Sequence, residues 1–284
     1  VERSRGLGDV YKRQLIVCGG GVRYSGASQA LADFAERTGI PVAATQAGKS
    51  AMVEDHELYV GSLGVTGASA ANSLAEQADV VLSVGSRLQD FTTGSNSLIK
   101  GKVIALNVQA HDLVKHDAMP LMGDALGGIE ALSQAMGAYS TGDGYRAEIA
   151  SSWDRWIKEV ADVCDTPADS NALPSDSQVI GAVNRACPPE TIVVGAAGSM
   201  PGELHKLWQV GGVDGYHMEY GFSCMGYEVA AGIGVDMAAP DRPNVVFAGD
   251  GSYLMLNAEL ATAVMMGRSM TLIITDNRGF GCIN

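Results

Sequence analysis

Short apolar runs alternate with amphipathic segments along most of this sequence, and this alternation limits the folds that the chain can adopt. LIVCGGG (residues 15–21) predicts a strand that ends at three glycines, and ASQALADFAERTG (27–39) predicts a helix with Leu31, Phe34 and Ala35 on one face. Further strands are predicted at 40–45, 78–86, 102–108, 191–199, 244–251 and 270–277, and further helices at 69–78, 124–137, 177–186, 226–238 and 257–267. Strands joined by helices run parallel, so we expect an α/β fold with helices on both faces of each sheet.

The alternation is interrupted once, by a segment that is polar at its edges. Inside it, IASSWDRWIKEV (149–160) predicts a helix with Trp153, Trp156 and Ile157 on one face. A chain of 284 residues has room for two domains. We therefore expect a first α/β domain over 15–138, a linker with a docking helix over 139–177, and a second α/β domain over 178–284.

The two ends of the chain differ from the rest. Residues 1–14 (VERSRGLGDVYKRQ) are polar and basic without an apolar period, and they are expected to be a non-native or disordered leader. The other end follows a strand with a glycine-rich loop, so the chain is expected to stop inside its second domain.

Composition excludes several classes of function. The net charge of −13 argues against a nucleic-acid partner, because a basic surface is needed to displace phosphate counterions. No apolar run reaches the ~18 residues that a membrane span needs. The five cysteines are scattered, which predicts buried or half-buried thiols of a reducing cytoplasm rather than disulfides or a zinc site.

Two predicted strand ends of the second domain carry oxygen ligands. NVVFAGDG brings Asp250 to the carboxyl edge of the sheet, where doubly wound folds bind their ligands, and TLIITDN brings Asn277 to the same edge. Gly279 adds a backbone carbonyl. Gly249 and Gly251 allow a tight turn, and the helix that follows offers its N-terminus to an anion. Each turn alone would be an ordinary strand end, but together the three oxygens suit a magnesium ion that also binds a diphosphate.

The GDG and DN pair, with residues 252–275 between them, resembles the metal-binding motif of thiamin-diphosphate enzymes. Most of these enzymes have Asn where this chain has Asp276, whereas the metal ligand is the second residue of the pair. EYGFSCMGYEVAAGIG (219–234) and VVGAAGSMPGE (193–203) resemble two further cofactor segments of the same enzymes.

The resemblance implies the residues of a cofactor site. Magnesium would be held by Asp250, Asn277 and the carbonyl of Gly279. Met225 would support the bent conformation in which the cofactor activates itself, and the Ser252 hydroxyl would reach a phosphate oxygen. The implied thiamin-diphosphate contacts are Gly198, Ser199, Met200, Ser223, Cys224, Met225, Asp250, Gly251, Ser252 and Asn277.

Several segments narrow the resemblance, among them CGGGVRYSGA, TQAGKSAMVEDHE, AAGSMPGELHKLW and GFSCMGYE. Together they are similar to the trihydroxycyclohexanedione hydrolases of myo-inositol catabolism, acetolactate-synthase-like enzymes that open the ring of a cyclic diketone to give 5-deoxyglucuronate. A carboligase or decarboxylase of 2-oxo acids, related to acetolactate synthase, is the alternative. The resemblance also implies a homodimer or homotetramer.

The remaining candidates carry weaker signals. No catalytic residue is expected in this chain apart from His205, a candidate proton donor whose alternative is a half-exposed helical histidine. His217 and Glu219 could face the substrate. Lys49 and Arg87 lie at predicted strand ends of the first domain, where such side chains are more often solvated or structural than ligands. In the resembled enzymes, the glutamate that activates the cofactor comes from an N-terminal domain, so this chain alone is expected to be inactive.

GGGVRYSGA (19–27) permits a hypothesis from another class of function. It follows a predicted strand and precedes a helix, as a dinucleotide fingerprint does, but Tyr24 stands where that fingerprint needs its third glycine. A non-catalytic nucleotide-binding module stays open on this pattern.

Overall fold

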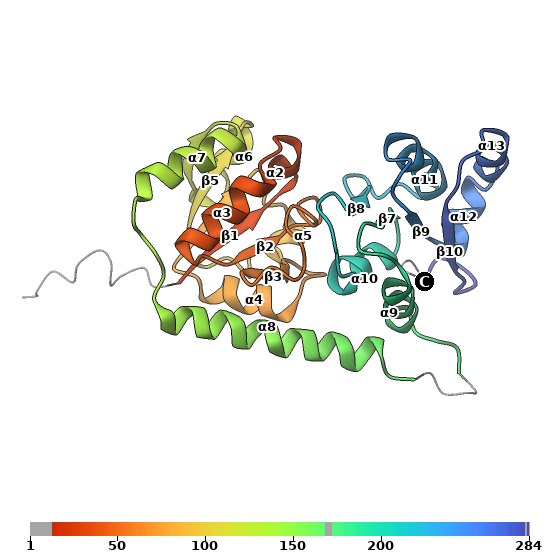
Figure 1. Cartoon of the computed structure of the whole chain (residues 1–284), viewed down its shortest axis with the longest axis horizontal. Coiled ribbons are helices and arrows are strands. Elements are labelled where there is room, and N and C mark those ends of the chain that lie inside the picture. The colour runs from red at the N-terminus through yellow and green to blue at the C-terminus, as the bar shows by residue number, and fades with distance from the viewer. Residues whose placement is uncertain (1–12, 168–171, 282, 284) are drawn as a thin grey trace, which may run out of the picture. The chain divides into compact units, whose positions relative to one another are not determined.

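The computed structural model describes residues 13–167, 172–281 and 283, and it contains two compact units (Figure 1). The first unit runs to Glu159 and the second begins at Val160. This division falls inside helix α8 (Asp143–Cys164), which is longer than the predicted docking helix.

The first unit is a six-stranded parallel sheet in the order β3-β2-β1-β4-β5-β6. Its strands are β1 (Gln14–Cys18), β2 (Val42–Ala44), β3 (Tyr59–Ser62), β4 (Val80–Val84), β5 (Lys102–Asn107) and β6 (Met119–Met122). The helices between them are α2 (Gly20–Tyr24), α3 (Ser28–Thr38), α4 (Ser69–Gln77), α5 (Asp90–Thr93), α6 (Ala110–Leu113), a 3₁₀ turn (Lys115–Asp117) and α7 (Ala125–Met136). The predicted α/β class with parallel strands is confirmed.

The second unit is a smaller parallel sheet in the order β10-β9-β7-β8. Its strands are β7 (Ile192–Gly195), β8 (Tyr216–Met218), β9 (Asn244–Gly249) and β10 (Thr271–Thr275). Its helices are α9 (Asp176–Ala186), α10 (Met200–Leu207), α11 (Tyr227–Ala238), α12 (Asp250–Met255) and α13 (Glu259–Met265). The start of α9 is fixed by a capping box, in which Ser175 and Gln178 satisfy each other's backbone amides.

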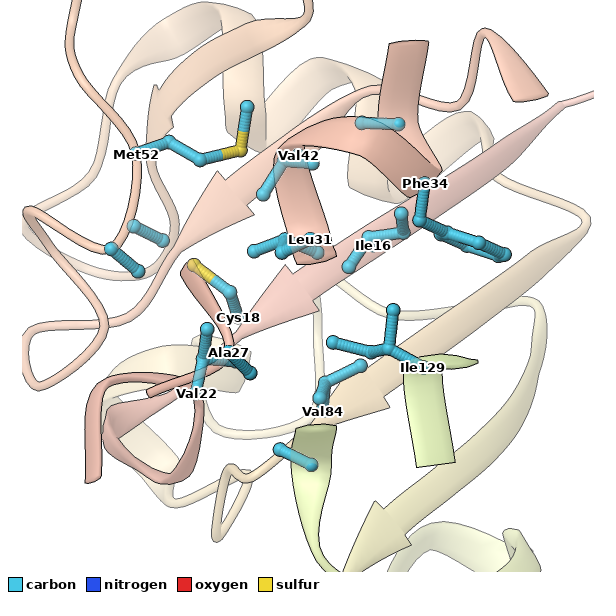
Figure 2. Packing of buried hydrophobic residues seen from close by; sticks show 14 of the residues in the cluster. Ile16, Cys18, Val22, Ala27, Leu31, Phe34, Val42, Met52, Val84 and Ile129 are labelled. Carbon is cyan, nitrogen blue, oxygen red and sulfur yellow. The ribbon is translucent and has the colours of Figure 1, made fainter. Parts of the chain in front are cut away.

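The core of the first unit lies between β1, β2 and the helices α3 and α7. Leu31 and Phe34 of α3 are buried against Ile16 and Val42, with Ile129 of α7 beside Val84 (Figure 2). The helical face predicted for α3 is therefore the buried one. Figure 1 shows α4 and α8 on the opposite side of the sheet from α3 and α7, so both faces are covered.

Three strands were not predicted. β6 contains Pro120 and is mostly exposed at the sheet edge, so it carries no apolar period. β3 has only four residues, one of which is Gly61, and β8 has only three.

Part of the predicted linker belongs to the first unit. Trp153 of α8 makes an edge-to-face contact with Tyr59, with ring centroids 6.0 Å apart, and Glu159 accepts a hydrogen bond from Ser69. Residues 139–159 therefore belong to the first unit, and the chain passes into the second unit inside α8.

The leader predicted over residues 1–14 extends into residues that belong to the fold. Gln14 is the first residue of β1, and its carbonyl accepts the Tyr145 hydroxyl at 2.8 Å. The Arg13 amide donates to the Asp79 carboxylate at 3.0 Å. These polar residues belong to the fold through their backbones, which an apolar pattern cannot reveal. The rest of the predicted leader lies outside the described residues.

The glycines after β1 pack directly on the end of β4. The amides of Gly19 and Gly21 donate to the carbonyls of Val84 and Gly85, and a Cβ on Gly21 would lie 2.6 Å from the Gly85 Cα. A dinucleotide fingerprint needs such amides free for a pyrophosphate. The geometry therefore assigns these glycines to backbone packing and removes the support for the nucleotide-binding hypothesis.

The cysteines are not all sheltered. Cys18 and Cys164 are buried and Cys187 is half-buried, but Cys224 is exposed, so the expectation of sheltered thiols is wrong there. Cys282 lies outside the described residues. Within the described part of the chain, no helix combines the length and apolar character needed to cross a membrane.

Gly21→Ala should destabilise the protein, because the added methyl group overlaps the Gly85 backbone. We expect thermal unfolding to show a Tm about 3–8 °C lower, from ~1–3 kcal/mol of overpacking. Gly127→Ala is the matched control, since a Cβ there meets no atom within 4 Å and should hold or raise the Tm. A Gly21→Ala variant as stable as the wild type would contradict the close packing.

Iodoacetamide at pH 8 should label Cys224 well before Cys18. Burial raises the pKa of Cys18 to about 12, so only ~10⁻⁴ of that thiol is ionised at this pH. Peptide mapping by mass spectrometry on the folded protein gives both rates, and equal labelling of the two would refute the buried position of Cys18.

Candidate functional site

A cavity of about 540 Å³ opens at the carboxyl edge of the second sheet. This volume is typical of sites for small molecules and cofactors. The loops after β7, β9 and β10, the loop before α11 and the segment around the start of α9 form its walls. The predicted site residues that line it are Gly198, Ser199, Met200, Ser223, Met225, Asp250, Gly251, Ser252, Asn277 and Gly279.

The pairing of β9 with β10 brings the two predicted metal ligands to one edge. Gly249 and Thr275 are partners in the parallel register, so both strands end at the same level. Asp250 follows the first strand directly, and Asn277 comes two residues after the second.

Asp250 carries a buried oxygen that suits a cation. Among the residues that the structure describes, its Oδ1 atom is buried and has no hydrogen-bond partner. A buried carboxylate oxygen without a donor is costly unless an ion or water satisfies it. The described residues contain no group of three or more His, Cys, Asp or Glu side chains arranged for a metal. A cation at this edge would therefore depend on Asp250, an amide and backbone oxygens.

The loop after β10 is a tight turn held by Asp276. Its Oδ1 accepts the Arg278 amide at 2.8 Å, and Arg278 has a φ of 61°. An asparagine oxygen would accept the same amide, so Asp276 is an acceptable replacement for the Asn of the resembled motif.

Two glycines leave room for a ligand in the cavity. A Cβ on Gly198 or Gly249 would meet no atom within 4 Å, and Gly198 has a φ of 90°, which favours glycine. Gly251 is different, because a Cβ there would lie 2.6 Å from the Phe280 ring. The open backbone and the unsatisfied carboxylate together fit a phosphate group bound through a cation.

The loop that carries Met225 is organised by Glu219. Its carboxylate accepts the amides of Phe222 at 3.0 Å and Cys224 at 2.7 Å. Burial raises the pKa of Glu219, but the amide donors outweigh burial and hold it below the usual range. Cys224 does not line the cavity, unlike its neighbours Ser223 and Met225. The Cys224 amide instead donates to the Glu219 carboxylate within this loop.

A glutamate that the sequence analysis missed connects the walls of the site. Glu228, 1% exposed in the first turn of α11, accepts the Ala197 amide at 3.3 Å and the Gly226 amide at 3.1 Å. It also accepts the Ser252 hydroxyl at 2.7 Å. In the sequence, Glu228 is the one charged residue at the start of the apolar segment YEVAAGIG. An acidic residue there is common in the first turn of a helix and does not by itself indicate a site.

The Ser252 hydroxyl has other partners than the predicted phosphate. It donates to Glu228 and accepts the Gly226 amide at 2.7 Å. A hydroxyl has one proton to donate, so in this arrangement Ser252 borders the cavity without a hydroxyl proton for a phosphate.

The two weaker histidine candidates lie elsewhere. His205 is only 2% exposed within α10, so the half-exposed alternative is wrong, and it does not line the cavity. His217 of β8 lies 2.7 Å from the Tyr227 hydroxyl, with the two rings stacked. Neither histidine reaches the cavity wall.

The two weaker cationic candidates differ in exposure. Lys49 is fully buried, 3.6 Å from Glu54, and burial lowers its pKa although the glutamate opposes this. Arg87 is exposed and bonds to Gln89. Both belong to the first unit, where Lys49 is part of the buried interior and Arg87 is part of the surface.

Two family models match the chain. Residues 9–132 match the thiamine pyrophosphate enzyme central domain, and residues 196–284 match the thiamine pyrophosphate enzyme C-terminal TPP binding domain. The second match includes every predicted cofactor and metal residue.

Curated relatives carry a more specific name, 3D-(3,5/4)-trihydroxycyclohexane-1,2-dione hydrolase. The chain is 40% identical to the one from Geobacillus thermodenitrificans, 41% to one from Clostridium perfringens and 39% to the one from Clostridium tetani. Each comparison covers 96% of this chain and 46% of the relative, so the chain spans about half the length of the curated relatives it matches.

Proposed function

Because this chain belongs to the thiamine pyrophosphate enzyme family, we propose that the protein carrying it is a thiamin-diphosphate-dependent hydrolase that opens the ring of 3D-trihydroxycyclohexane-1,2-dione. The observation that carries this proposal is the cavity at the ends of β7, β9 and β10, most of whose lining residues lie within the segment matched by the TPP binding domain. Identity of about 40% to hydrolases of that name supports the substrate. The activity is that of the whole protein, since the chain spans 46% of these relatives.

The residues of the cavity have distinct parts in this proposal. Asp250, Asn277 and the Gly279 carbonyl would hold magnesium against the diphosphate, for which Gly198 and Gly249 leave room. Met225 offers an apolar wall for the cofactor rings. When bound, thiamin diphosphate supplies an electron sink for cleavage of a bond next to a carbonyl group.

The proposed reaction is a hydrolysis that needs no oxidant. The bond between the two carbonyl carbons of the ring breaks. Water gives its hydroxyl to one of these carbons, which becomes a carboxylic acid, and a proton to the other, which becomes an aldehyde. The open-chain product is 5-deoxyglucuronate.

The active protein is proposed to be a homodimer or homotetramer. Relatives of this type use a glutamate from a partner subunit to activate the cofactor, as the resemblance implies. No residue of the cavity is assigned that role here, and His205 is buried away from the cavity wall.

Asp250→Ala should abolish magnesium-dependent binding of thiamin diphosphate to the intact protein. Isothermal titration should give a Kd at least ~100-fold weaker, because the variant lacks the only charged ligand of the proposed set. Asp276→Asn is the matched control. The amide oxygen can still accept the Arg278 amide, so the Kd should stay within ~3-fold of the wild type. Equal affinity of the wild type and Asp250→Ala would rule out the assigned metal ligand.

The intact protein should consume the cyclic dione and leave pyruvate unchanged. Mass spectrometry of parallel reactions with thiamin diphosphate and magnesium should detect 5-deoxyglucuronate from the first substrate and no acetolactate from the second. Acetolactate formation without loss of the dione would instead support the carboligase.

A further inference from the structure

The loops around the cavity meet at one buried carboxylate. Glu228 is 1% exposed, and its two oxygens accept hydrogen bonds from Ala197, Gly226 and Ser252. Each donor lies in a different segment: the loop after β7, the turn before α11, and helix α12.

Each of these donors belongs to a wall of the cavity or adjoins one. Ala197 and Ser252 line the cavity themselves, and Gly226 directly follows the lining residue Met225. A displacement of any donor would therefore move a residue that lines the cavity.

We propose that Glu228 is a positioning residue, which fixes the three loops of the cofactor cradle in their binding arrangement before the cofactor arrives. This inference rests on the proposed function, since it takes the cavity to be the thiamin-diphosphate site. Glu228 does not line the cavity and acts only through the loops that it joins.

The geometry makes a carboxylate hard to replace. The Ser252 hydroxyl and the Gly226 amide both donate to Oε2, and the Ala197 amide donates to Oε1. A glutamine has one acceptor oxygen, so its NH₂ group would face an amide donor on one side. One of the three loops would then lose its anchor, although the side chain keeps its size.

Gly226 makes the turn that this arrangement requires. It has a φ of 87°, and its amide is shared between Glu228 and the Ser252 hydroxyl at 2.7 Å. The three groups form a closed set of hydrogen bonds that connects Met225 on one side with Asp250 on the other.

Glu228→Gln in the intact protein tests the proposal. Isothermal titration with thiamin diphosphate and magnesium should give a Kd weakened ~10–100-fold, while the number of sites per chain stays that of the wild type. Glu259→Gln, in the first turn of α13, is the matched control and should bind as the wild type does. Ser252→Ala removes one of the three bonds and should weaken binding by a smaller factor, ~3–10-fold.

The two parameters of the titration separate positioning from a merely structural role. Partial unfolding would lower the number of sites and leave the Kd of the remaining sites unchanged, which would overturn the proposal. Unchanged Kd values in both Glu228→Gln and Ser252→Ala would also overturn it. If Glu228→Gln fails to fold, the Kd of Ser252→Ala decides. A wild type that does not bind thiamin diphosphate would overturn the proposed function together with this inference, whereas binding by the wild type confines a failure to Glu228.

Discussion

The parallel pairing of β9 with β7 and β10 is the constraint on which the candidate site depends. The carboxyl ends of parallel strands point to the same edge of the sheet. β9 is held between β7 and β10, and β10 ends level with it. Asp250 and Asn277 are far apart in sequence. They reach one cavity because the residues before them, Gly249 and Thr275, are partners in the register of β9 and β10. The chemistry of the site thus follows from backbone hydrogen bonds made some distance from it.

The strands set the level of the loops, and side chains inside the loops set their shape. Glu219 holds the loop that carries Met225, Asp276 holds the turn after β10, and Glu228 joins three segments. All three are acidic side chains that accept backbone amides, which are strong donors to a carboxylate. Three of the acids in this strongly acidic chain thus shape loops inside the second unit.

The two units show two uses of glycine at strand ends. In the first unit, Gly21 and Gly85 bring two backbones into contact and close the edge of the sheet. In the second unit, Gly198 and Gly249 border empty space. The same residue type after a strand therefore predicts a turn, but only the surrounding structure decides whether that turn packs or binds.

The sequence could predict the elements and site residues that leave a local pattern in the chain, and it missed those that depend on distant contacts. Strands with a continuous apolar run, such as β1 and β9, and helices with one apolar face, such as α3, were found because burial imposes these patterns. The edge strand β6 and the three-residue β8 were missed because they bury too little to impose one. Motif spacing located ten of the residues that line the cavity, but none of those at the start of α9, such as Pro174 and Val179. It misplaced Cys224 and the Ser252 hydroxyl, since it cannot say where a side chain points. Glu228 escaped because two of its three partners, Ala197 and Ser252, are distant in sequence.

A crystal structure of the intact protein with thiamin diphosphate and Mn²⁺ in place of magnesium would test the central claim most directly. We expect one anomalous manganese peak bound by Asp250, Asn277 and the Gly279 carbonyl, with the diphosphate in the cavity beside Gly198. A manganese ion bound by other residues, or a diphosphate outside this cavity, would contradict it.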